Sequence, residues 1–139
     1  MKIEELKVYI NQRQIGKVKF AFADIDGVLR GKFISVQKLM DVLDFGCGFC
    51  DVVFGWDSQD TLYKNADSVT GWHTGFPDQV CRIDLDTYRT IPWQQDIPFF
   101  IADFSHAAAG EIACPRSLLK RVADKATTLG YTPRFAQEF

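Results

Sequence analysis

Residues 17–36, with the sequence KVKFAFADIDGVLRGKFISV, decide the fold of this chain. Apolar side chains recur at every second position from Val18 to Phe22, and a second run rich in β-branched and apolar residues follows Asp26-Gly27. An Asp-Gly pair between two such runs is typical of a type I′ turn, because both central residues need a positive φ. The stretch therefore predicts a β-hairpin with a tight turn.

A helix is predicted directly after this hairpin. Ser35 can cap it through its hydroxyl, and apolar residues at helical spacing continue from Leu39 to Leu43 before glycines at 46 and 48 end it. Strand, strand and helix in this order open a β-grasp. We therefore predict the α+β class, with a β-grasp-like mixed sheet packed by one or two helices.

Further elements are predicted on either side of this unit. Residues 3–14 carry apolar side chains near helical spacing, and VCRIDL (80–85) and IPFFIADF (97–104) predict two more strands. Between residues 45 and 79, polar residues and glycines surround several aromatic residues, and only residues 51–54 have a weak strand pattern. A loop this long within a compact domain is usually functional or mobile.

The C-terminal part of the chain predicts a second domain that is cut short. Pro115 suits the first turn of a helix that Gly130 ends, and residues 131–139 begin an apolar strand that remains unfinished. Such an ending indicates a piece of a longer protein. The predicted division is an N-terminal helix at 1–14, a β-grasp domain at 15–113, and a connecting helix with the first strand of the next domain at 114–139.

Composition excludes several classes of protein. The 139 residues are 47% hydrophobic, which is enough for one packed core. Sixteen basic and 18 acidic residues leave a net charge of -2 without a dense basic run, so we expect no nucleic-acid partner. The first ten residues lack the apolar stretch of a signal peptide or membrane span, so we expect a cytoplasmic protein without a membrane partner.

The four cysteines are expected to be reduced thiols without disulfides. Cys47 and Cys50 form a C-x-x-C motif, which is found in redox centres and zinc sites. This motif follows a helical pattern instead of opening a helix, and Cys81 and Cys114 stand alone in the sequence. The spacing favours a structural role for the thiols.

The motif FAFADIDGV (20–28) suits a second chemistry. A hydrophobic strand that ends in D-x-D-G is similar to the nucleophile strand of haloacid dehalogenase-type phosphatases, in which one aspartate attacks phosphorus. Such an enzyme also needs a downstream lysine and a paired acidic motif for magnesium, and the chain offers a hairpin and no such pair. A small phosphatase using Asp24 stays the weaker alternative, and Asp26 is interpreted as a turn residue.

Two blocks of sequence resemble the glutamine synthetase family and its γ-glutamyl-amine ligase relatives. FADIDGVLRGKFISVQKL (22–39) is similar to that family's apolar strand, D-x-x-G, [RK]-G-K step and helix. ACPRSLLKRVADKATTLGYTPRFAQEF (113–139) is similar to its proline-arginine-serine helix and the strand with the first metal-binding glutamates. The resemblance spans residues 15–139 and identifies the N-terminal β-grasp domain, with the catalytic domain beginning at its end.

The resemblance implies an ATP-dependent ligase that joins ammonia or an amine to glutamate with Mg²⁺ or Mn²⁺. The active sites of such a homo-oligomeric, dodecamer-like ring lie between neighbouring subunits, so the N-terminal domain alone is expected to be inactive and to bind no cofactor. A self-contained β-grasp module that binds a protein partner is the alternative from another class.

The resemblance also assigns site residues. Asp57 in GWDSQD resembles the aspartate of the family's F-D-G-S-S loop, which would attract an ammonium ion and accept its proton; otherwise it caps its own loop. Ser58 of the same loop is a candidate for substrate binding, and the Ser-Gln sequence that it begins departs from Gly-Ser-Ser, which favours an amine substrate. Trp56, Trp72 and His73 are candidates for a substrate pocket or for anchors of the loop.

Glu138 matches the first glutamate of the metal-binding G-x-E-x-E strand, whose carboxylate oxygens suit magnesium or manganese. Ala136 and Gln137 depart from the pattern, and the second glutamate would lie beyond Phe139. The alternative is an exposed carboxylate near a frayed terminus.

Overall fold

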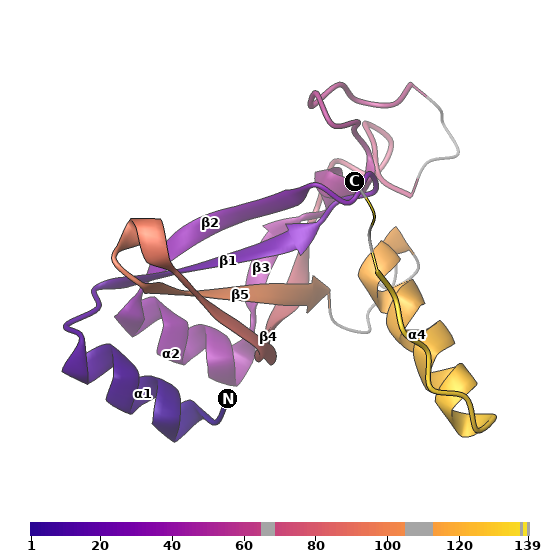
Figure 1. Ribbon diagram of the computed structural model, residues 1–139. Helices are drawn as coiled ribbons and strands as arrows, with labels where there is room; N and C mark the ends of the chain where they lie inside the picture. Colours follow the sequence, from indigo (N-terminus) through magenta and orange to yellow (C-terminus); the bar gives the residue numbers. More distant parts are fainter. Residues whose placement is uncertain (65–68, 105–112, 137, 139) are drawn as a thin grey trace.

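The computed structural model describes residues 1–64, 69–104, 113–136 and 138. Five strands form one mixed sheet in the order β2-β1-β5-β4-β3, with α1 and α2 below it and α4 beside the end of β5 in Figure 1. The predicted α+β class with a mixed β-grasp-like sheet is confirmed. The elements are α1 (Ile3–Gln12), β1 (Lys17–Ala23), β2 (Leu29–Ser35), α2 (Val36–Phe45), β3 (Cys47–Cys50), the 3₁₀ turn η1 (Asp51–Phe54), β4 (Asp78–Ile91), the 3₁₀ turn η2 (Pro92–Gln94), β5 (Ile97–Phe104) and α4 (Pro115–Thr128).

Strand β1 is an inner strand of the sheet, antiparallel to β2 and parallel to β5. Its side chains Phe20 and Phe22 are buried and pack edge to face, with ring centroids 5.8 Å apart. Leu6 of α1 and Leu39 of α2 are fully buried in the same core. Burial of each large apolar side chain contributes about 1.5–3 kcal/mol, and a one-residue slip would expose this face, so the register of β1 is strongly specified.

The β1–β2 hairpin is confirmed, but the predicted type I′ turn is wrong. Five residues, 24–28, connect the strands, and Gly27 has a positive φ of 81° whereas Asp26 does not. The Asp24 carboxylate accepts hydrogen bonds from the backbone N–H groups of Asp26 (3.0 Å) and Val28 (2.8 Å). This aspartate side chain replaces a backbone partner and organises a wider loop.

The weak strand predicted at residues 51–54 is also wrong. This segment is a 3₁₀ turn, and the strand is the preceding segment β3, whose residues pair with Asp78–Cys81 of β4. Val53 and Phe54 are consecutive and both buried. A strand would place them on opposite faces, whereas a helical turn lets both reach the core.

Helices α2 and α4 form as predicted. The Ser35 hydroxyl accepts a hydrogen bond from the N–H of Lys38 (3.1 Å) and caps α2. Pro115 lies in the first turn of α4, and Gly130 follows its end with a φ of 86°. No strand forms in residues 131–136, because a strand needs a neighbour for its backbone groups and none of the five strands pairs with this segment. Residues 65–68 of the long loop and 105–112 of the predicted β-grasp domain lie outside the described residues.

Charged side chains attach α4 to the sheet. Arg116 and Lys120 both pair with Asp84 of β4 and Asp103 of β5, at N–O distances of 2.5–2.9 Å. Desolvation raises the pKa of Asp84, but hydrogen bonds from Arg116 and Lys120 outweigh it and lower that pKa to about 2. The apolar side chains of α4 remain about half exposed: Leu118, Leu119 and Val122. None of the helices described is both long and apolar enough to cross a membrane.

Candidate functional site

One guanidinium group holds the loop that contains Asp57. Arg30 Nε donates to Asp24 Oδ2 (2.8 Å), and Nη1 pairs with Asp60 Oδ1 (2.5 Å). Nη2 lies 3.3 Å from the carbonyl oxygen of Asp57 and 3.4 Å from that of Ser58. The planar fork of arginine offers donors in several fixed directions, so one side chain fixes both the backbone and a carboxylate of the loop.

The position of Arg30 follows from the hairpin. Arg30 pairs with Phe22 in the β1–β2 register, which places its side chain close to the end of β1. There, the carboxylate of Asp24 is fully buried and accepts two backbone hydrogen bonds besides the bond from Arg30. The hydrogen bond to Asp24 raises the pKa of Arg30, burial opposes this, and the charge of Asp60 adds to it. Asp24 therefore fixes the orientation of the guanidinium group that contacts the loop.

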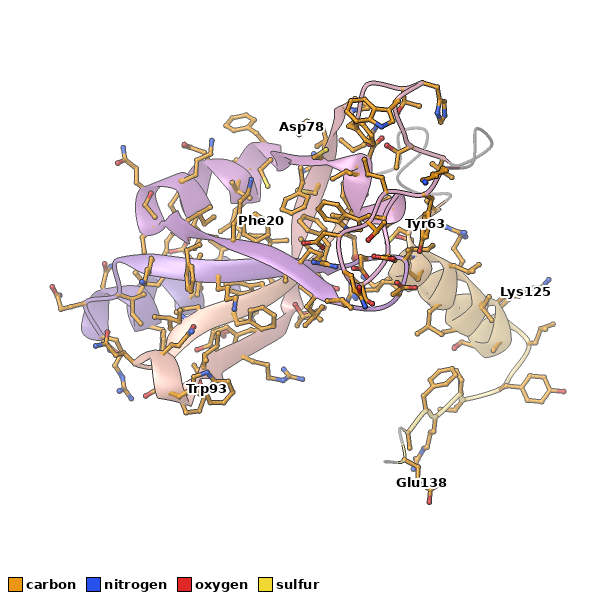
Figure 2. All side chains as sticks on the ribbon, turned by 90° about the horizontal axis from the view of Figure 1, so that it is seen from above. Phe20, Tyr63, Asp78, Trp93, Lys125 and Glu138 are labelled. Atoms are coloured by element: carbon orange, nitrogen blue, oxygen red, sulfur yellow. The ribbon has the colours of Figure 1, made fainter. Side chains whose placement is uncertain are left out.

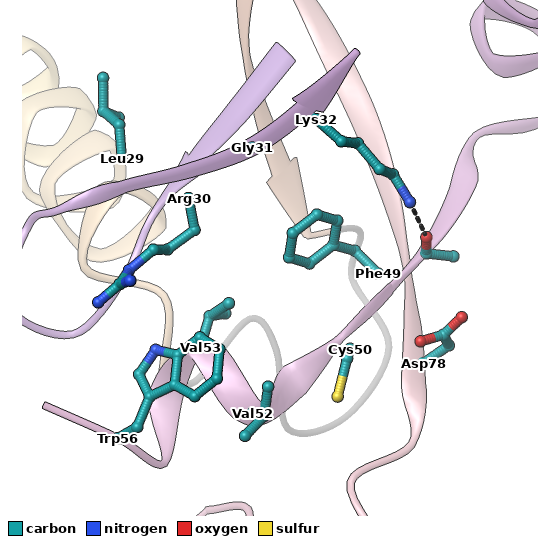
Figure 3. A pocket seen from close by; sticks show the side chains of 11 residues that line it. Leu29, Arg30, Gly31, Lys32, Phe49, Cys50, Val52, Val53, Trp56 and Asp78 are labelled. Atoms are coloured by element: carbon teal, nitrogen blue, oxygen red, sulfur yellow. Dashed lines mark hydrogen bonds between the residues drawn. The ribbon is translucent and has the colours of Figure 1, made fainter. Parts of the chain in front are cut away.

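A cavity of about 550 Å³ opens between the edge strands β2 and β3 and the loop (Figure 3). Arg30 lies over the ring of Trp56, 5.2 Å from its centroid, in a cation–π contact. Lys32 extends across the cavity, with Nζ 3.5 Å from the carbonyl oxygen of Gly48 and 5.1 Å from the Phe49 ring. Within the described part of the chain, the buried Nε1 of Trp56 has no hydrogen-bond partner. This wall combines aromatic faces with positive charge.

Asp57 caps its own loop. Its Oδ1 accepts hydrogen bonds from the N–H groups of Gln59 (2.8 Å) and Thr61 (2.9 Å), and its own N–H donates to the Thr61 carbonyl (3.0 Å). These backbone donors, Thr61 first and then Gln59, lower the pKa of Asp57, and the charge of Arg30 contributes. The half-buried side chain is thus an ionised carboxylate on a loop of defined shape.

The aromatic candidates do not all gather at this site. Trp56 lines the cavity, and the carbonyl oxygen of Ser58 lies 3.4 Å from Arg30 Nη2, next to Asp57 in the chain. Trp72 is 83% exposed and packs edge-on against Phe76, with ring centroids 5.2 Å apart. His73 is also exposed, and neither it nor Trp72 lines the cavity between β2 and β3.

A buried polar pair, which the sequence analysis missed, fixes the second half of the loop. Thr70 Oγ1 donates to Asp51 Oδ1 (2.5 Å), and both residues are about 1% exposed. The amide of Gln79 adds a longer contact to Oδ2 (3.4 Å). The signal in the sequence was an aspartate directly before the apolar residues VVF, where a buried carboxylate needs a donor.

Glu138 lies apart from these groups. It is exposed and stands at the tip of the C-terminal segment, away from the sheet (Figure 2). In the segments 1–64, 69–104, 113–136 and 138, no three His, Cys, Asp or Glu side chains are close enough to hold a metal ion. The described residues of this chain therefore do not form a metal site by themselves.

Asp24 and Arg30 are the residues whose importance the sequence analysis did not recognise. Asp24 is the candidate nucleophile of the phosphatase alternative, but its carboxylate is buried and engaged by three donors, so it does not face a substrate. A detectable signal was an arginine in the second strand of a hairpin, six residues after an aspartate that directly follows the first strand. A buried carboxylate there needs donors, and an arginine on the returning strand can supply one.

Comparison with known proteins gave a consistent set of matches, although no family model matches the chain. The chain is 46% identical over 134 residues to type-1 glutamine synthetase 2 of Dictyostelium discoideum, covering 94% of this chain and 26% of that protein. It is 33% identical over 140 residues to a glutamate–isopropylamine ligase of a Pseudomonas species, covering 99% of this chain and 30% of the ligase. The chain thus spans between a quarter and a third of the length of these relatives.

The fold has counterparts among solved structures. One named "GmaS/ADP complex-Conformation 1" superposes with a TM-score of 0.66 at 22% identity, covering 89% of this chain and 26% of that one. At this identity the match concerns the fold alone. The five-stranded sheet with its helices is therefore an arrangement that also occurs within a much longer chain.

Proposed function

Because this chain belongs to the glutamine synthetase family, whose N-terminal part it matches, we propose that it supplies an active-site loop to an ATP-dependent ligase that joins ammonia or an amine to glutamate. The observation that carries this proposal is the loop around Asp57, which Arg30 fixes through two backbone carbonyls and Asp60. A loop held from one side in this way presents its carboxylate at a constant position.

The carboxylate of Asp57 has the chemistry that the proposed role requires. An ionised carboxylate attracts an ammonium or alkylammonium ion and can accept its proton, which frees the nitrogen lone pair for attack on an activated carboxyl group. The lowered pKa of Asp57 keeps the group ionised at neutral pH. Arg30 is directed at the loop backbone, so the negative charge of Asp57 is only partly offset by it.

ATP and Mg²⁺ or Mn²⁺ would be bound outside the described residues, since these offer no metal-binding cluster. In the proposed enzyme the metal and nucleotide activate the γ-carboxylate of glutamate for substitution. This chain's part is to position Asp57. The domain would complete the active site of a neighbouring subunit in a homo-oligomeric ring, and we propose that it acts in the cytoplasm.

The choice between ammonia and an amine depends on the loop. The step from Asp57 to Ser58 and Gln59 departs from the Gly-Ser-Ser sequence of the ammonia-type loop, and Trp56 adds an aromatic face beside it. Arg30 already occupies the cation–π position on Trp56, so the preference for an alkylammonium ion over ammonium would come from apolar contact between its alkyl group and the indole. We propose a small primary amine as the substrate, with ammonia as the alternative.

A chimera tests this proposal. Residues 1–136 of this chain would replace the matching part of the Dictyostelium relative, which is 46% identical and thus offers a compatible interface. ADP release would be measured with ATP, glutamate, and either ammonia or a panel of primary amines. Asp57→Asn keeps the oxygen that accepts the loop hydrogen bonds and removes only the charge, so we expect turnover to fall at least tenfold.

Asp26→Asn is the matched control, because Asp26 is an exposed aspartate on the hairpin loop. It should leave turnover unchanged. A chimera that assembles and is active, but tolerates Asp57→Asn, would refute the role of Asp57. A well-folded, assembled chimera that lacks all activity would favour the self-contained interaction module, which would bind a partner through its exposed sheet or its long loop.

A further inference from the structure

Two thiols face each other across the β3–β4 ladder, although the C-x-x-C motif does not bring its own cysteines together. Cys47 and Cys81 are direct partners in the antiparallel register, and their Sγ atoms lie 3.0 Å apart. Such partners have Cα atoms about 4.5–5.5 Å apart, within the roughly 4.4–6.8 Å that disulfides span. Cys50 is three residues from Cys47 on the same strand, so it faces the opposite side.

The surrounding backbone keeps this pair close. Cys81 Sγ also lies 3.0 Å from the carbonyl oxygen of Cys47. At the end of α2, Gly46 has a φ of 78°, and a Cβ there would lie 2.6 Å from the Cys81 carbonyl oxygen. Only glycine allows so close an approach, so the end of α2 and the two strands are held together at this point. The sulfurs need to approach by only about 1 Å to reach the S–S distance of about 2.05 Å.

The two thiols are not equivalent. Cys47 is half-buried, whereas Cys81 is fully buried. The hydrogen bond from Cys81 lowers the pKa of Cys47 to about 7, although burial raises that pKa. The positive charges of Lys32 (β2) and Lys38 (α2) also lower it, and the negative charge of Asp78 (β4) raises it. The same pairing and burial raise the pKa of Cys81. Cys47 is therefore the accessible thiolate and Cys81 the protonated partner.

We propose that Cys47 and Cys81 form an oxidation site for hydroperoxides, in which Cys47 reacts first and a β3–β4 disulfide is the product. The Cys47 thiolate attacks one peroxide oxygen, the O–O bond breaks, and hydroxide leaves, which oxidises the sulfur to a sulfenic acid. The Cys81 sulfur then attacks the Cys47 sulfur; its proton and the departing hydroxide form water as the S–S bond forms. A small dithiol reductant returns both thiols. This inference is independent of the proposed ligase function.

The disulfide would act on the part of the fold that carries the loop. Strand β3 leads directly into η1, which contains Asp51, and Phe49 and Cys50 line the cavity beside Arg30. The short strand β3 pairs with β4 over four residues. A covalent bond at the first of these pairs would hold that edge of the cavity in place.

The test uses the purified 139-residue chain and hydrogen peroxide as the oxidant. We expect the intact mass to fall by two hydrogen atoms, and non-reducing peptide mapping to find Cys47 joined to Cys81. The rate of thiol loss should rise with pH to half its maximum near pH 7, as the pKa of Cys47 requires. In Cys81→Ser, a sulfenic acid should accumulate on Cys47 and be trapped by dimedone.

Cys50→Ser is the matched control, since Cys50 lies on the same strand and is also half-buried, but donates to the carbonyl oxygen of Phe76 (3.3 Å). It should leave the oxidation unchanged, whereas Cys47→Ser should abolish it. A Cys47–Cys50 disulfide, or sulfinic acid on Cys47 without a cross-link in the unmutated chain, would overturn the inference. The mapping of the unmutated chain decides this even if a variant fails to fold.

Discussion

Asp24 offers a sharp test of how the hairpin supports the loop, because its side chain makes three separable hydrogen bonds. Two come from the backbone N–H groups of Asp26 and Val28, and one comes from Arg30 Nε. Asp24→Ala removes all three from a fully buried position. At about 1 kcal/mol for each bond, the free energy of unfolding should fall by about 3 kcal/mol.

Asp24→Asn separates the two kinds of bond. The amide oxygen of asparagine can still accept hydrogen bonds from both backbone N–H groups. Its NH₂ group would replace the carboxylate oxygen that faces Arg30 Nε, so the bond from Arg30 is lost because both groups are donors. The expected loss is therefore about 1 kcal/mol. Because Arg30 then loses its anchor, the amide protons of Gln59 and Thr61 should exchange faster although their own acceptor, Asp57, is intact.

Urea unfolding followed by tryptophan fluorescence measures the stability of these variants. With a slope of about 2 kcal/mol per M, the midpoint should fall by about 1.5 M for Asp24→Ala and about 0.5 M for Asp24→Asn. Asp26→Asn, on the exposed part of the same loop, is the control and should shift it by less than about 0.25 M. If Asp24→Asn is as damaging as Asp24→Ala, or if neither differs from Asp26→Asn, the interpretation of Asp24 as the anchor of Arg30 is wrong.

Three further predictions concern stability. The pKa of Asp84 is lowered from 3.8 to about 2 in the folded chain, so the stabilisation by its basic partners is complete above about pH 4 and is lost as the pH falls through 2. After allowance for screening at this partly exposed site, we expect this stabilisation to be about 1 kcal/mol. Urea midpoints measured across this pH range should show the loss in the unmutated chain and not in Asp84→Asn. Gly46→Ala should cost about 2 kcal/mol in the same assay, since its positive φ and its contact with Cys81 both exclude a Cβ, whereas Gly16→Ala, with open space around it, should change little. Thr70→Val should cost about 2 kcal/mol because Asp51 stays buried without that donor, and Thr70→Ser should restore most of it; equal losses for Val and Ser would show that packing, not the hydroxyl, is what matters.

Local patterns were sufficient to predict the elements with strong periodicity. The alternation from Val18 to Phe22, the Ser35 cap and the proline and glycine that bound α4 each have one local cause, and the structure contains all three elements. The hairpin turn was mispredicted because the decisive partner of its backbone was the Asp24 side chain rather than the Asp-Gly pair. The 3₁₀ turn at η1 was mispredicted because its geometry serves burial of two consecutive residues, which only tertiary packing determines.

The candidate site likewise combines residues that local sequence could identify with residues that only tertiary structure brings together. Asp57, Trp56 and Ser58 are adjacent in sequence, so their proximity was certain once the loop was recognised. The capping alternative for Asp57 corresponds to two hydrogen bonds in the structure. The role of Arg30 required the register of two strands and the return of a loop 27 residues later. The approach of Cys47 to Cys81 likewise joins residues 34 positions apart and has no local signature.

The attachment of α4 has a mechanical consequence. Ion pairs between two basic side chains and two carboxylates form the contacts described between this helix and the sheet, and its leucines and valine remain half exposed. Ion pairs between a helix and a sheet weaken as ionic strength rises, because mobile ions screen the charges, whereas apolar packing is not screened in this way. The attachment of α4 to the sheet should therefore become more flexible as the salt concentration rises. The angle between the sheet and any structure that packs on the apolar side of the helix would then vary with ionic strength, while both remain folded.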